Sequence, residues 1–362
     1  MGSFGMKTVA VGLSGGVDST LTAHLLKEQG YHVIGLSMSI YNGDIPAHVT
    51  GDACYGPTEK QDIRDIQKWA AEHDIEAHIL DLSEPYKKTV LKYFRDSYLS
   101  GLTPNPCVMC NTLMKFGLLA EEARKQGIQF DYFATGHYAR IEKHNGRYIL
   151  KKGIDPHKDQ SYFLYRLTQQ QLATTLFPLG NYTKDQVREM ARARGLTVAE
   201  KADSQDFYAG DYSDLLGQSP QPGPIVLTTG KILGQHQGFW NYTIGQRKGL
   251  GIAYPEPLFV VDIDASHNRV IVGTAKDTYG TGCLAENIVW GGLIDFPTES
   301  TAVTAKYRSS GKTVPAVITG ENNHIRVTFD EPQRAITRGQ SIVFYRDDCV
   351  LGGGIITESI ST

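Results

Sequence analysis

The 362-residue sequence lacks any apolar run near the roughly 18–20 residues that a helix needs to span a bilayer. Its start has no apolar signal core, and it lacks the Ser or Thr at the sixth position that N-myristoylation prefers. No charge sign dominates, because 36 Lys and Arg stand against 39 Asp and Glu. These absences predict a cytoplasmic protein with no membrane partner, and they exclude a surface coated uniformly in positive charge.

Cysteine is also scarce, and five residues are too few for a disulfide framework in a chain of this size. Three of them, Cys54, Cys107 and Cys110, lie in the first third of the chain, and the last two form a Cys-x-x-Cys pair. In a reducing compartment this clustering favours redox, sulfur or metal chemistry over a structural cross-link. Cys283 and Cys349 lie in a β-rich region, and we interpret them as structural bystanders.

Short apolar runs alternate with helical patterns through the first 205 residues. Helices are expected after Ser19, from Thr58 and from Thr183, and Gln61 and Gln186 are placed to complete capping boxes at the last two. The predicted strands are residues 8–13, 33–36, 79–82 and 132–137. This alternation predicts an α/β fold with a doubly wound parallel sheet, whose ligand lies outside the carboxyl ends of the strands.

The pattern changes near residue 205, where short strands broken by glycines replace the helices. We therefore expect three domains. The first, residues 1–205, is the catalytic α/β domain. A small central β-rich domain is expected over residues 206–277. Residues 278–362 are expected to form an antiparallel β-barrel, with a sandwich as the alternative.

Residues 14–19 (SGGVDS), between a predicted strand and a predicted helix, are the most informative stretch. Two glycines let the backbone approach a ligand closely, and successive N–H groups before a helix form an anion cradle. Asp18 is placed to hold a magnesium ion on a phosphate. The loop is not a Walker motif, because the Gly-Lys-Ser/Thr ending is missing. We favour this phosphate loop over a glycine turn in which Asp18 or Ser19 is an ordinary helix cap.

This hexapeptide resembles the pyrophosphate loop of the N-type ATP pyrophosphatases, which cleave ATP between its α and β phosphates and adenylate a substrate. Further motifs are similar, in combination, to those of the tRNA-specific 2-thiouridylase family. They are residues 103–111 (TPNPCVMCN), 134–138 (ATGHY), 158–164 (KDQSYFL), 241–249 (NYTIGQRKG) and 307–308 (YR). The resemblance covers nearly the whole chain. It implies that ATP activates the C2 oxygen of the anticodon wobble uridine of tRNA, and that sulfur then displaces AMP.

The resemblance also implies the site residues. Contacts to ATP would come from Gly12, Leu13, Ser14, Gly15, Gly16, Val17, Asp18, Ser19, Met38 and Gly136. Contacts to tRNA would come from Asn105, Pro106, Cys107, Lys158, Asp159, Gln160, Tyr307 and Arg308. The central domain, residues 206–277, would also contact tRNA. Cys110 matches the family's nucleophilic cysteine, and Cys107 and Asp18 complete the expected catalytic set.

Several of these residues have plainer interpretations. A lone methionine such as Met38 is commonly core filler, and residues 158–160 are also typical of a solvated charge cluster. The basic side chains of the helix from Thr183 could follow RNA phosphates or form a solvated helix face. These residues are Lys184, Arg188, Arg192 and Arg194.

The sequence departs from the family at the second cysteine of its persulfide relay. The family reads Ser-Gln, two residues, Cys-Phe, whereas residues 204–209 read SQDFYA, with Tyr208 in the place of the cysteine. No cysteine occurs between Cys110 and Cys283. The relay as usually described therefore cannot run here. Tyr208 is expected to face the same pocket without contributing sulfur.

Cys107 offers a compensation, because relay members often have aspartate there. With Cys54 and Cys110 it supplies three thiolates, which can hold a four-iron–four-sulfur cluster and leave one iron free for sulfide. The alternatives are a reversible Cys54–Cys110 disulfide or simple buried thiols, while zinc would need a fourth ligand such as His48 or His137. The three cysteines are expected together at the mouth of the nucleotide cleft. Sulfide or a persulfide-carrying protein is the expected sulfur donor.

Two other functions stay open on the sequence. An amide-forming ATP pyrophosphatase synthetase would need an ammonia source, and the sequence carries no amidotransferase signature. A non-catalytic tRNA-binding relic would not need to keep an intact glycine loop.

Overall fold

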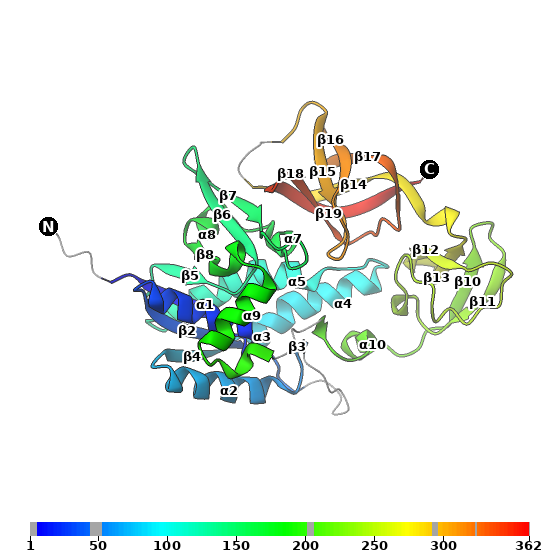
Figure 1. Ribbon diagram of the computed structural model, residues 1–362. Helices are drawn as coiled ribbons and strands as arrows, with labels where there is room; N and C mark the ends of the chain where they lie inside the picture. Colours follow the sequence, from blue (N-terminus) through cyan, green and yellow to red (C-terminus); the bar gives the residue numbers. More distant parts are fainter. Residues whose placement is uncertain (1–5, 44–52, 201–205, 292–295, 323, 362) are drawn as a thin grey trace.

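The computed structural model describes residues 6–43, 53–200, 206–291, 296–322 and 324–361. A parallel sheet with helices, a small β-rich domain and an antiparallel barrel follow one another along the chain (Figure 1). The predicted fold class is confirmed, and the barrel replaces its sandwich alternative. In the described part of the chain, every helix is too short or too polar to cross a membrane.

A five-stranded parallel sheet forms the centre of the first domain, in the order β4-β2-β1-β5-β8. Its strands are β1 (Thr8–Gly12), β2 (His32–Ser39), β4 (Glu76–Asp81), β5 (Tyr132–Ala134) and β8 (Thr175–Leu176). Because β1 pairs with both β2 and β5, the order of the strands reverses at β1. The carboxyl ends of β1 and β5 therefore form the topological switch point, where a sheet of this kind binds its ligand.

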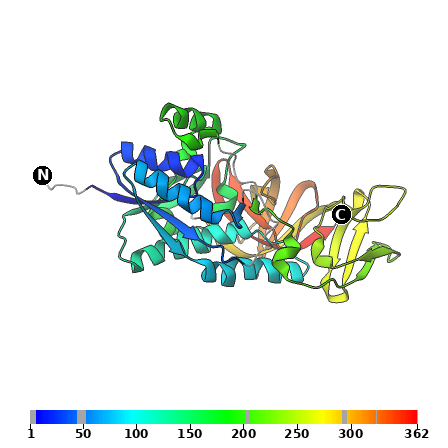
Figure 2. The same cartoon turned by 90° about the horizontal axis from the view of Figure 1, so that it is seen from below.

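Helices cover both faces of this sheet (Figure 2). The helical segments are α1 (Val17–Glu28), α2 (Glu59–Glu72), α3 (Ser83–Tyr86), α4 (Lys92–Leu99), α5 (Pro106–Met109), α6 (Leu119–Lys125), α7 (Ser161–Leu164), α8 (Gln169–Ala173) and α9 (Lys184–Ala193), with the π-helical segments η1 (Lys87–Leu91) and η2 (Cys110–Leu118) and the 3₁₀ turns η3 (Pro178–Asn181) and η4 (Thr197–Glu200). Since η2 joins α5 to α6, residues 106–125 form one continuous helix of mixed winding.

The two expected capping boxes have different outcomes. At α9 the box is present, because the Gln186 N–H donates to Thr183 Oγ1 and the Thr183 N–H donates to Gln186 Oε1. At α2 the prediction is wrong, since Thr58 itself has a helical backbone and makes no side-chain cap. A capping box needs an extended residue at that position. Gln61 donates instead to Asp65, 2.7 Å away.

The central domain contains α10 (Tyr212–Leu216) and a four-stranded sheet in the order β11-β10-β13-β12. Its strands are β10 (Gly223–Leu227), β11 (Ile232–His236), β12 (Phe259–Asp264) and β13 (Arg269–Gly273), and its 3₁₀ turns are η5 (Phe239–Asn241), η6 (Ala265–His267) and η7 (Lys276–Thr278). The short apolar runs at residues 225–227, 259–261 and 270–272 predict three of these strands. The fourth, β11, was missed because its Gly-Gln-His half is neither β-branched nor alternating.

The C-terminal barrel is closed, because β14 pairs with both β17 and β19. Its strands are β14 (Tyr279–Trp290), β15 (Thr301–Lys306), β16 (Val314–Glu321), β17 (His324–Arg334), β18 (Ser341–Arg346) and β19 (Cys349–Ser361). Closure removes the exposed strand edges that an open sheet would leave. Cys283 lies fully buried in its core, where burial raises the pKa of the thiol to about 12.

The barrel is joined directly to the first domain. A hairpin of the first domain, β6 (Ala139–His144) and β7 (Arg147–Lys152), extends the barrel sheet through the pairing of Lys151 with Cys349. Arg140 donates to Asp348 at 2.7 Å across the same seam. A two-stranded parallel sheet also forms, from β3 (Ala53–Tyr55) and β9 (Asp206–Tyr208).

Gly136, directly after β5, packs against the first turn of α1. A Cβ at this position would lie 2.7 Å from the carbonyl carbon of Asp18 and 2.8 Å from the backbone nitrogen of Ser19. We therefore expect Gly136→Ala to push α1 away from β5 and to lower the free energy of unfolding by about 1–3 kcal/mol. Urea unfolding measures this loss, and Gly234→Ala, whose Cβ would meet nothing closer than 3.6 Å, is the matched control. Equal stability of the two variants would contradict the close packing.

Candidate functional site

A cleft of about 490 Å³ opens at the carboxyl ends of β1, β2 and β5, where the strand order places a ligand. All but one of the residues expected to contact ATP line it. They are Gly12, Leu13, Ser14, Gly16, Val17, Asp18, Ser19, Met38 and Gly136. The exception is Gly15, whose φ of +74° makes the turn of the loop and whose Cα faces the side chain of Ile66.

Hydrogen bonds within the loop fix its shape. The N–H of Ser14 donates to Ser19 Oγ at 3.2 Å, and this hydroxyl donates to the carbonyl of Gly16 at 3.1 Å. Gly16 is the N-cap of α1 and has no side chain to cap the helix, so neither Asp18 nor Ser19 serves as the cap. The helix-cap role that the alternative gave to Asp18 or Ser19 is therefore wrong. Residues at the start of α1 line the cleft, and the N–H groups of a helix start favour an anion.

The Asp18 carboxylate connects three segments. Lys184 Nζ, from α9, lies 2.9 Å from both carboxylate oxygens, and the Tyr138 hydroxyl donates to Oδ1 at 2.7 Å. Lys184 is 7% exposed, whereas the Asp18 side chain is 28% exposed, so the ion pair is partly buried. It holds the first turn of α1, the segment after β5 and α9 together beside the phosphate loop.

This contact corrects the interpretation of α9 as a helix that follows RNA phosphates. Lys184 points inward to Asp18, while Arg192 pairs with Glu200 and Arg194 pairs with Glu28, each at 2.7 Å. Three of its four basic side chains therefore have carboxylate partners within the protein.

The residues present fit a magnesium ion carried on ATP. A carboxylate offers about four acceptor positions, and the three bonds that Asp18 accepts leave one of them open. Magnesium in nucleotide sites commonly uses one or two carboxylates together with the substrate phosphates.

Two of the three clustered cysteines line the cleft. Cys54, on β3, is exposed, and Cys110, the first residue of η2, is partly buried. Cys107 lies on α5 and packs against the core beside them. Burial raises the pKa of the Cys110 thiol to about 11, an effect that Lys115 opposes and Cys54 strengthens. The expected gathering of thiols at the cleft is thus found for Cys54 and Cys110.

The thiols do not fit an iron–sulfur cluster as they are arranged. Among the residues that the structure describes, no three or more His, Cys, Asp or Glu side chains are grouped to hold a metal ion. His137, one candidate fourth ligand for zinc, has its Nδ1 2.7 Å from Thr135 Oγ1. The other candidate, His48, lies outside the described residues.

Glu59 and Lys115 line the cleft, although the sequence analysis gave them no role. His137, which it named only as a candidate zinc ligand, lines the cleft as well. Glu59 accepts hydrogen bonds from Ser39 Oγ at 2.8 Å and from the Ile40 N–H at 2.7 Å, and so fixes the segment after β2. Burial holds the pKa of His137 well below its ordinary value, so the imidazole is neutral. The ATGHY motif pointed to His137, whereas only the π-helical winding of η2 brings Lys115 toward the cleft.

Asn105, expected at the target base, serves here as a helix cap. Its Oδ1 accepts from the Val108 N–H at 3.2 Å, and Pro106 occupies the first position of α5. Asn105 is 7% exposed, and its side chain also bonds with the Tyr162 hydroxyl. Asn105 therefore helps to place the helix that carries Cys107 and Cys110.

The segment before α5 is held by the barrel. Gln340 Nε2 donates to the carbonyls of Thr103 and Pro104, both at 3.0 Å, and the Thr103 N–H donates to the carbonyl of Arg338 at 2.9 Å. Arg338 in turn donates to Asp262 of the central domain at 2.6 Å. All three domains thus meet at the start of the cysteine-bearing helix.

The other residues expected to contact tRNA are divided between two places. Lys158 and Gln160 line the nucleotide cleft, and Gln160 Oε1 accepts from the Tyr138 N–H at 2.9 Å. Asp159 instead accepts hydrogen bonds from the backbone and hydroxyl of Ser161. The solvated-cluster interpretation therefore fails for Gln160 and Asp159, which make internal bonds.

Tyr307 and Arg308 lie on the barrel, away from the residues that line the cleft. The Tyr307 hydroxyl donates to Gln333 Oε1 at 3.3 Å. Arg308 donates to the backbone carbonyls of Arg334 and Ala335. In this arrangement the polar ends of both side chains bind the last residues of β17 and Ala335, which follows it.

Tyr208 does not face the cleft, so that expectation is wrong. It is 2% exposed, and its hydroxyl donates to Asp214 at 2.8 Å. Pairing of β9 with β3 places Tyr208 beside Tyr55, which turns it into the core and leaves the neighbouring Cys54 at the cleft. Residues 204–205 of the family's cysteine motif lie outside the described residues.

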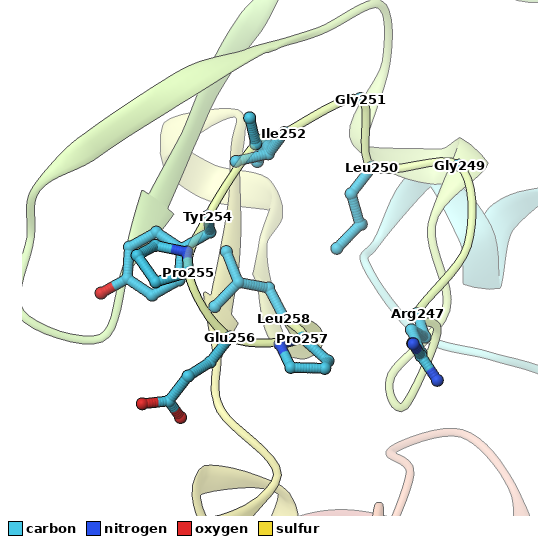
Figure 3. A pocket seen from close by; sticks show the side chains of 11 residues that line it. Arg247, Gly249, Leu250, Gly251, Ile252, Tyr254, Pro255, Glu256, Pro257 and Leu258 are labelled. Carbon is cyan, nitrogen blue, oxygen red and sulfur yellow. The ribbon is translucent and has the colours of Figure 1, made fainter.

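A second cavity, of about 580 Å³, lies in the loop between η5 and β12 of the central domain. Figure 3 shows Leu250 and Leu258 between Arg247 on one side and Tyr254 on the other. It shares no lining residue with the nucleotide cleft among those described.

Comparisons with known proteins cover nearly the whole chain. Residues 7–208 match a tRNA methyl transferase HUP domain, residues 214–274 a tRNA methyl transferase PRC-barrel domain, and residues 281–356 an aminomethyltransferase beta-barrel domain. A tRNA-specific 2-thiouridylase of Endomicrobium trichonymphae is 48% identical over 355 residues, covering 96% of this chain and 98% of that protein. The chain belongs to the tRNA-specific 2-thiouridylase family.

Further relatives agree with this membership. The 2-thiouridylase of Clostridioides difficile is 44% identical over 365 residues, covering 98% of this chain and 99% of that protein. A solved 4-thiouridine synthetase with RNA and ATP is 16% identical, covers 59% of this chain and 46% of that chain, and has a TM-score of 0.37, which is too low to carry an argument. The resemblance drawn from the motifs is confirmed.

Loss of either member of the Asp18–Lys184 pair leaves the other charge poorly compensated. We expect Lys184→Met and Asp18→Asn each to lower the free energy of unfolding by about 1–3 kcal/mol. This loss in the free energy of unfolding is smaller than for a fully buried ion pair, because the Asp18 side chain is 28% exposed. The double variant should lose less than the sum of the two, which urea unfolding of all four proteins measures. Strictly additive losses would mean that the two charges are not coupled.

Gln340 should hold the segment before α5 through its two donated hydrogen bonds. Gln340→Met keeps the length of the side chain but removes both donors, and we expect a loss of about 1–3 kcal/mol in stability. Backbone amides of residues 103–110 should exchange hydrogen faster than in the parent protein. Gln235→Met, at an exposed position on β11, is the control. Unchanged exchange across residues 103–110 would show that Gln340 does not hold this segment.

Proposed function

We propose that this protein is an ATP-dependent tRNA sulfurtransferase that replaces the C2 oxygen of the anticodon wobble uridine with sulfur. One observation carries the proposal: the glycine loop and the Cys110 thiol line the same cleft. A reaction that needs both a phosphate site and a sulfur nucleophile at one carbon atom requires this arrangement. Membership in the 2-thiouridylase family supports the same substrate class.

The first step would be adenylation. ATP would lie with its pyrophosphate on residues 14–19, where backbone N–H groups and the start of α1 favour negative charge. Met38 and Gly136 would contact the nucleotide from the ends of β2 and β5. The C2 oxygen of the uridine attacks the α-phosphate, the bond between the α and β phosphates breaks, and pyrophosphate leaves. Magnesium, held by Asp18, would neutralise the phosphates.

The second step would be displacement of AMP by sulfur. A persulfide-carrying protein transfers its outer sulfur to Cys110. The terminal sulfur anion attacks C2, the C2–S bond forms, the C2–O bond breaks, and AMP leaves with the electron pair. Cys54 thiolate then attacks Cys110 Sγ, which releases the 2-thiouridine sulfur with the electron pair and leaves a Cys54–Cys110 disulfide. An external dithiol supplies the two electrons and two protons that restore both thiols.

Cys54 suits this second thiol better than a cluster ligand, because it is exposed and lines the cleft with Cys110. Cys107, which packs on the core, would act by placing α5 and would stay reduced. Sulfide is the alternative donor, and it would attack C2 directly without an oxidised intermediate.

The RNA would reach this cleft through its anticodon loop. Single-stranded loops let a protein turn out one base and read its edges. Five residues would surround the target base, and they are Asn105, Pro106, Lys158, Asp159 and Gln160. Of these, Asn105 and Pro106 would act through α5, whose start they form. Tyr307 and Arg308 would contact the RNA from the barrel, which requires Arg308 to exchange its backbone partners for phosphate. The proposed protein has domain boundaries near residues 205 and 278 and a cytoplasmic location.

Cys110→Ala should abolish thiolation but leave adenylation and RNA binding close to the parent values. The reaction contains ATP, magnesium, a wobble-uridine tRNA and a persulfide donor, and nucleoside mass analysis measures 2-thiouridine. Exchange of pyrophosphate into ATP in the presence of tRNA reports adenylation separately. Full thiolation by Cys110→Ala would remove this cysteine from the mechanism.

Cys54→Ser should stall the reaction after AMP has left. We expect an RNA–protein adduct on Cys110, seen on a non-reducing gel and released by dithiothreitol. Cys349→Ser, on the barrel, is the control. Rapid, complete turnover by Cys54→Ser without an adduct would favour direct attack by sulfide. In a strain that lacks this protein, unchanged wobble thiolation would overturn the proposed function, and formation of an amide product instead would favour a synthetase.

A further inference from the structure

Lys115 is a cation of the cleft that has no carboxylate partner among the residues described by the structure. It lies within η2, five residues after Cys110, and both residues line the cleft. Positions five apart lie about 140° apart around an α-helix of 3.6 residues per turn. In a π-helix the i to i+5 hydrogen bonding brings them to the same side. The π-helical winding of η2 therefore sets the ammonium and the thiol toward one space.

No described residue gives Lys115 a hydrogen bond or a salt bridge, although other cationic side chains near the cleft are paired, as Lys184 is with Asp18. A charge taken out of water is costly unless an opposite charge compensates it. The residues around Lys115 show which group compensates its charge. Burial lowers the pKa of the Lys115 ammonium, but the thiols of Cys110, Cys54 and Cys107 outweigh this and raise the pKa above its ordinary value.

The other basic groups in or beside the cleft do not serve Cys110 in this way. Lys158 also lines the cleft, but it is not among the groups that act on the Cys110 thiol. His137 is neutral, because burial and the charge of Lys115 hold its pKa well below the ordinary value. Lys184 is committed to Asp18. Of the groups that act on the Cys110 thiol, Lys115 is the one that favours its anion, against burial and Cys54.

We propose that Lys115 is a catalytic residue whose ammonium pairs with the anionic sulfur on Cys110 as that sulfur attacks the activated base. The inference rests on the proposed sulfurtransferase function. During the attack, the sulfur's electron pair forms the C2–S bond, and the pair of the broken C2–O bond leaves on the phosphate oxygen of AMP. Negative charge thus moves from sulfur to phosphate within one cleft. The lysine holds the anion before attack and takes no proton from the reaction.

Lys115→Met tests this assignment, because it keeps an unbranched side chain and removes the charge. We expect single-turnover thiolation to fall by about a hundredfold or more, as when an enzyme loses a group that stabilises reacting charge. Pyrophosphate exchange and tRNA affinity should stay within about twofold of the parent values. Lys115→Arg should recover part of the thiolation rate, because it restores the charge. Lys125→Met, at an exposed position at the end of α6, is the control.

A second readout needs neither ATP nor tRNA, and so separates this inference from the proposed function. Alkylation of Cys110 by iodoacetamide depends on its thiolate fraction. We expect Lys115→Met to slow it by about tenfold at pH 8, as followed by mass analysis of the Cys110 peptide, and Lys115→Arg to restore it. If the parent protein fails to thiolate tRNA, the proposed function falls while this readout still tests the pairing.

Three results would overturn the inference. One is thiolation by Lys115→Met at the parent rate. Another is an equal loss of pyrophosphate exchange, which would assign Lys115 to the nucleotide. The third is alkylation of Cys110 that is unchanged in a Lys115→Met protein whose circular dichroism matches the parent.

Discussion

The ion pair between Asp18 and Lys184 is the contact on which the cleft depends. Sheet topology brings the ends of β1 and β5 together, but it does not fix the first turn of α1 against the segment after β5. The Asp18 carboxylate does so by accepting from Tyr138 on one side and from Lys184 on the other. Because the lysine is nearly buried, the pair resists exchange with water. The loop that would receive the leaving pyrophosphate in the proposed reaction is thereby held in place before the ligand arrives.

The cysteine-bearing helix is placed by a different domain. Its start is fixed from the barrel by Gln340 and the backbone of Arg338, and Arg338 also reaches Asp262 of the central domain. The β6–β7 hairpin meanwhile fuses the first domain to the barrel sheet. The two halves of the cleft, phosphate loop and thiols, are thus supported from opposite ends of the chain. A shift of the barrel on binding a large ligand would therefore reach the thiols before it reached the phosphate loop.

Much of this could be predicted from the sequence, and the failures share a cause. The glycine loop, the parallel sheet and the Thr183 cap follow from local patterns, because turn chemistry and periodicity are read within about ten residues. Tyr208 was misplaced because its neighbour on β3 lies about 150 residues earlier in the chain, beyond any local pattern. Lys184 was read as a surface charge because its partner, Asp18, is 166 residues away. Long-range pairing decided each of these cases.

The π-helical winding of η2 explains why sequence patterns did not predict that Lys115 lies at the cleft. Helical periodicity would set positions 110 and 115 on different faces, and only the π-helical segment reverses that. Such segments are rare because they pack and hydrogen-bond less well than an α-helix, so one that persists suggests a gain elsewhere in the structure. Here the gain is a cation beside a thiol whose burial alone would keep it protonated. Two lysines thus have separate tasks. Lys184 stiffens the glycine loop through the Asp18 carboxylate. Lys115, which has no carboxylate partner among the described residues, keeps its charge available to sulfur.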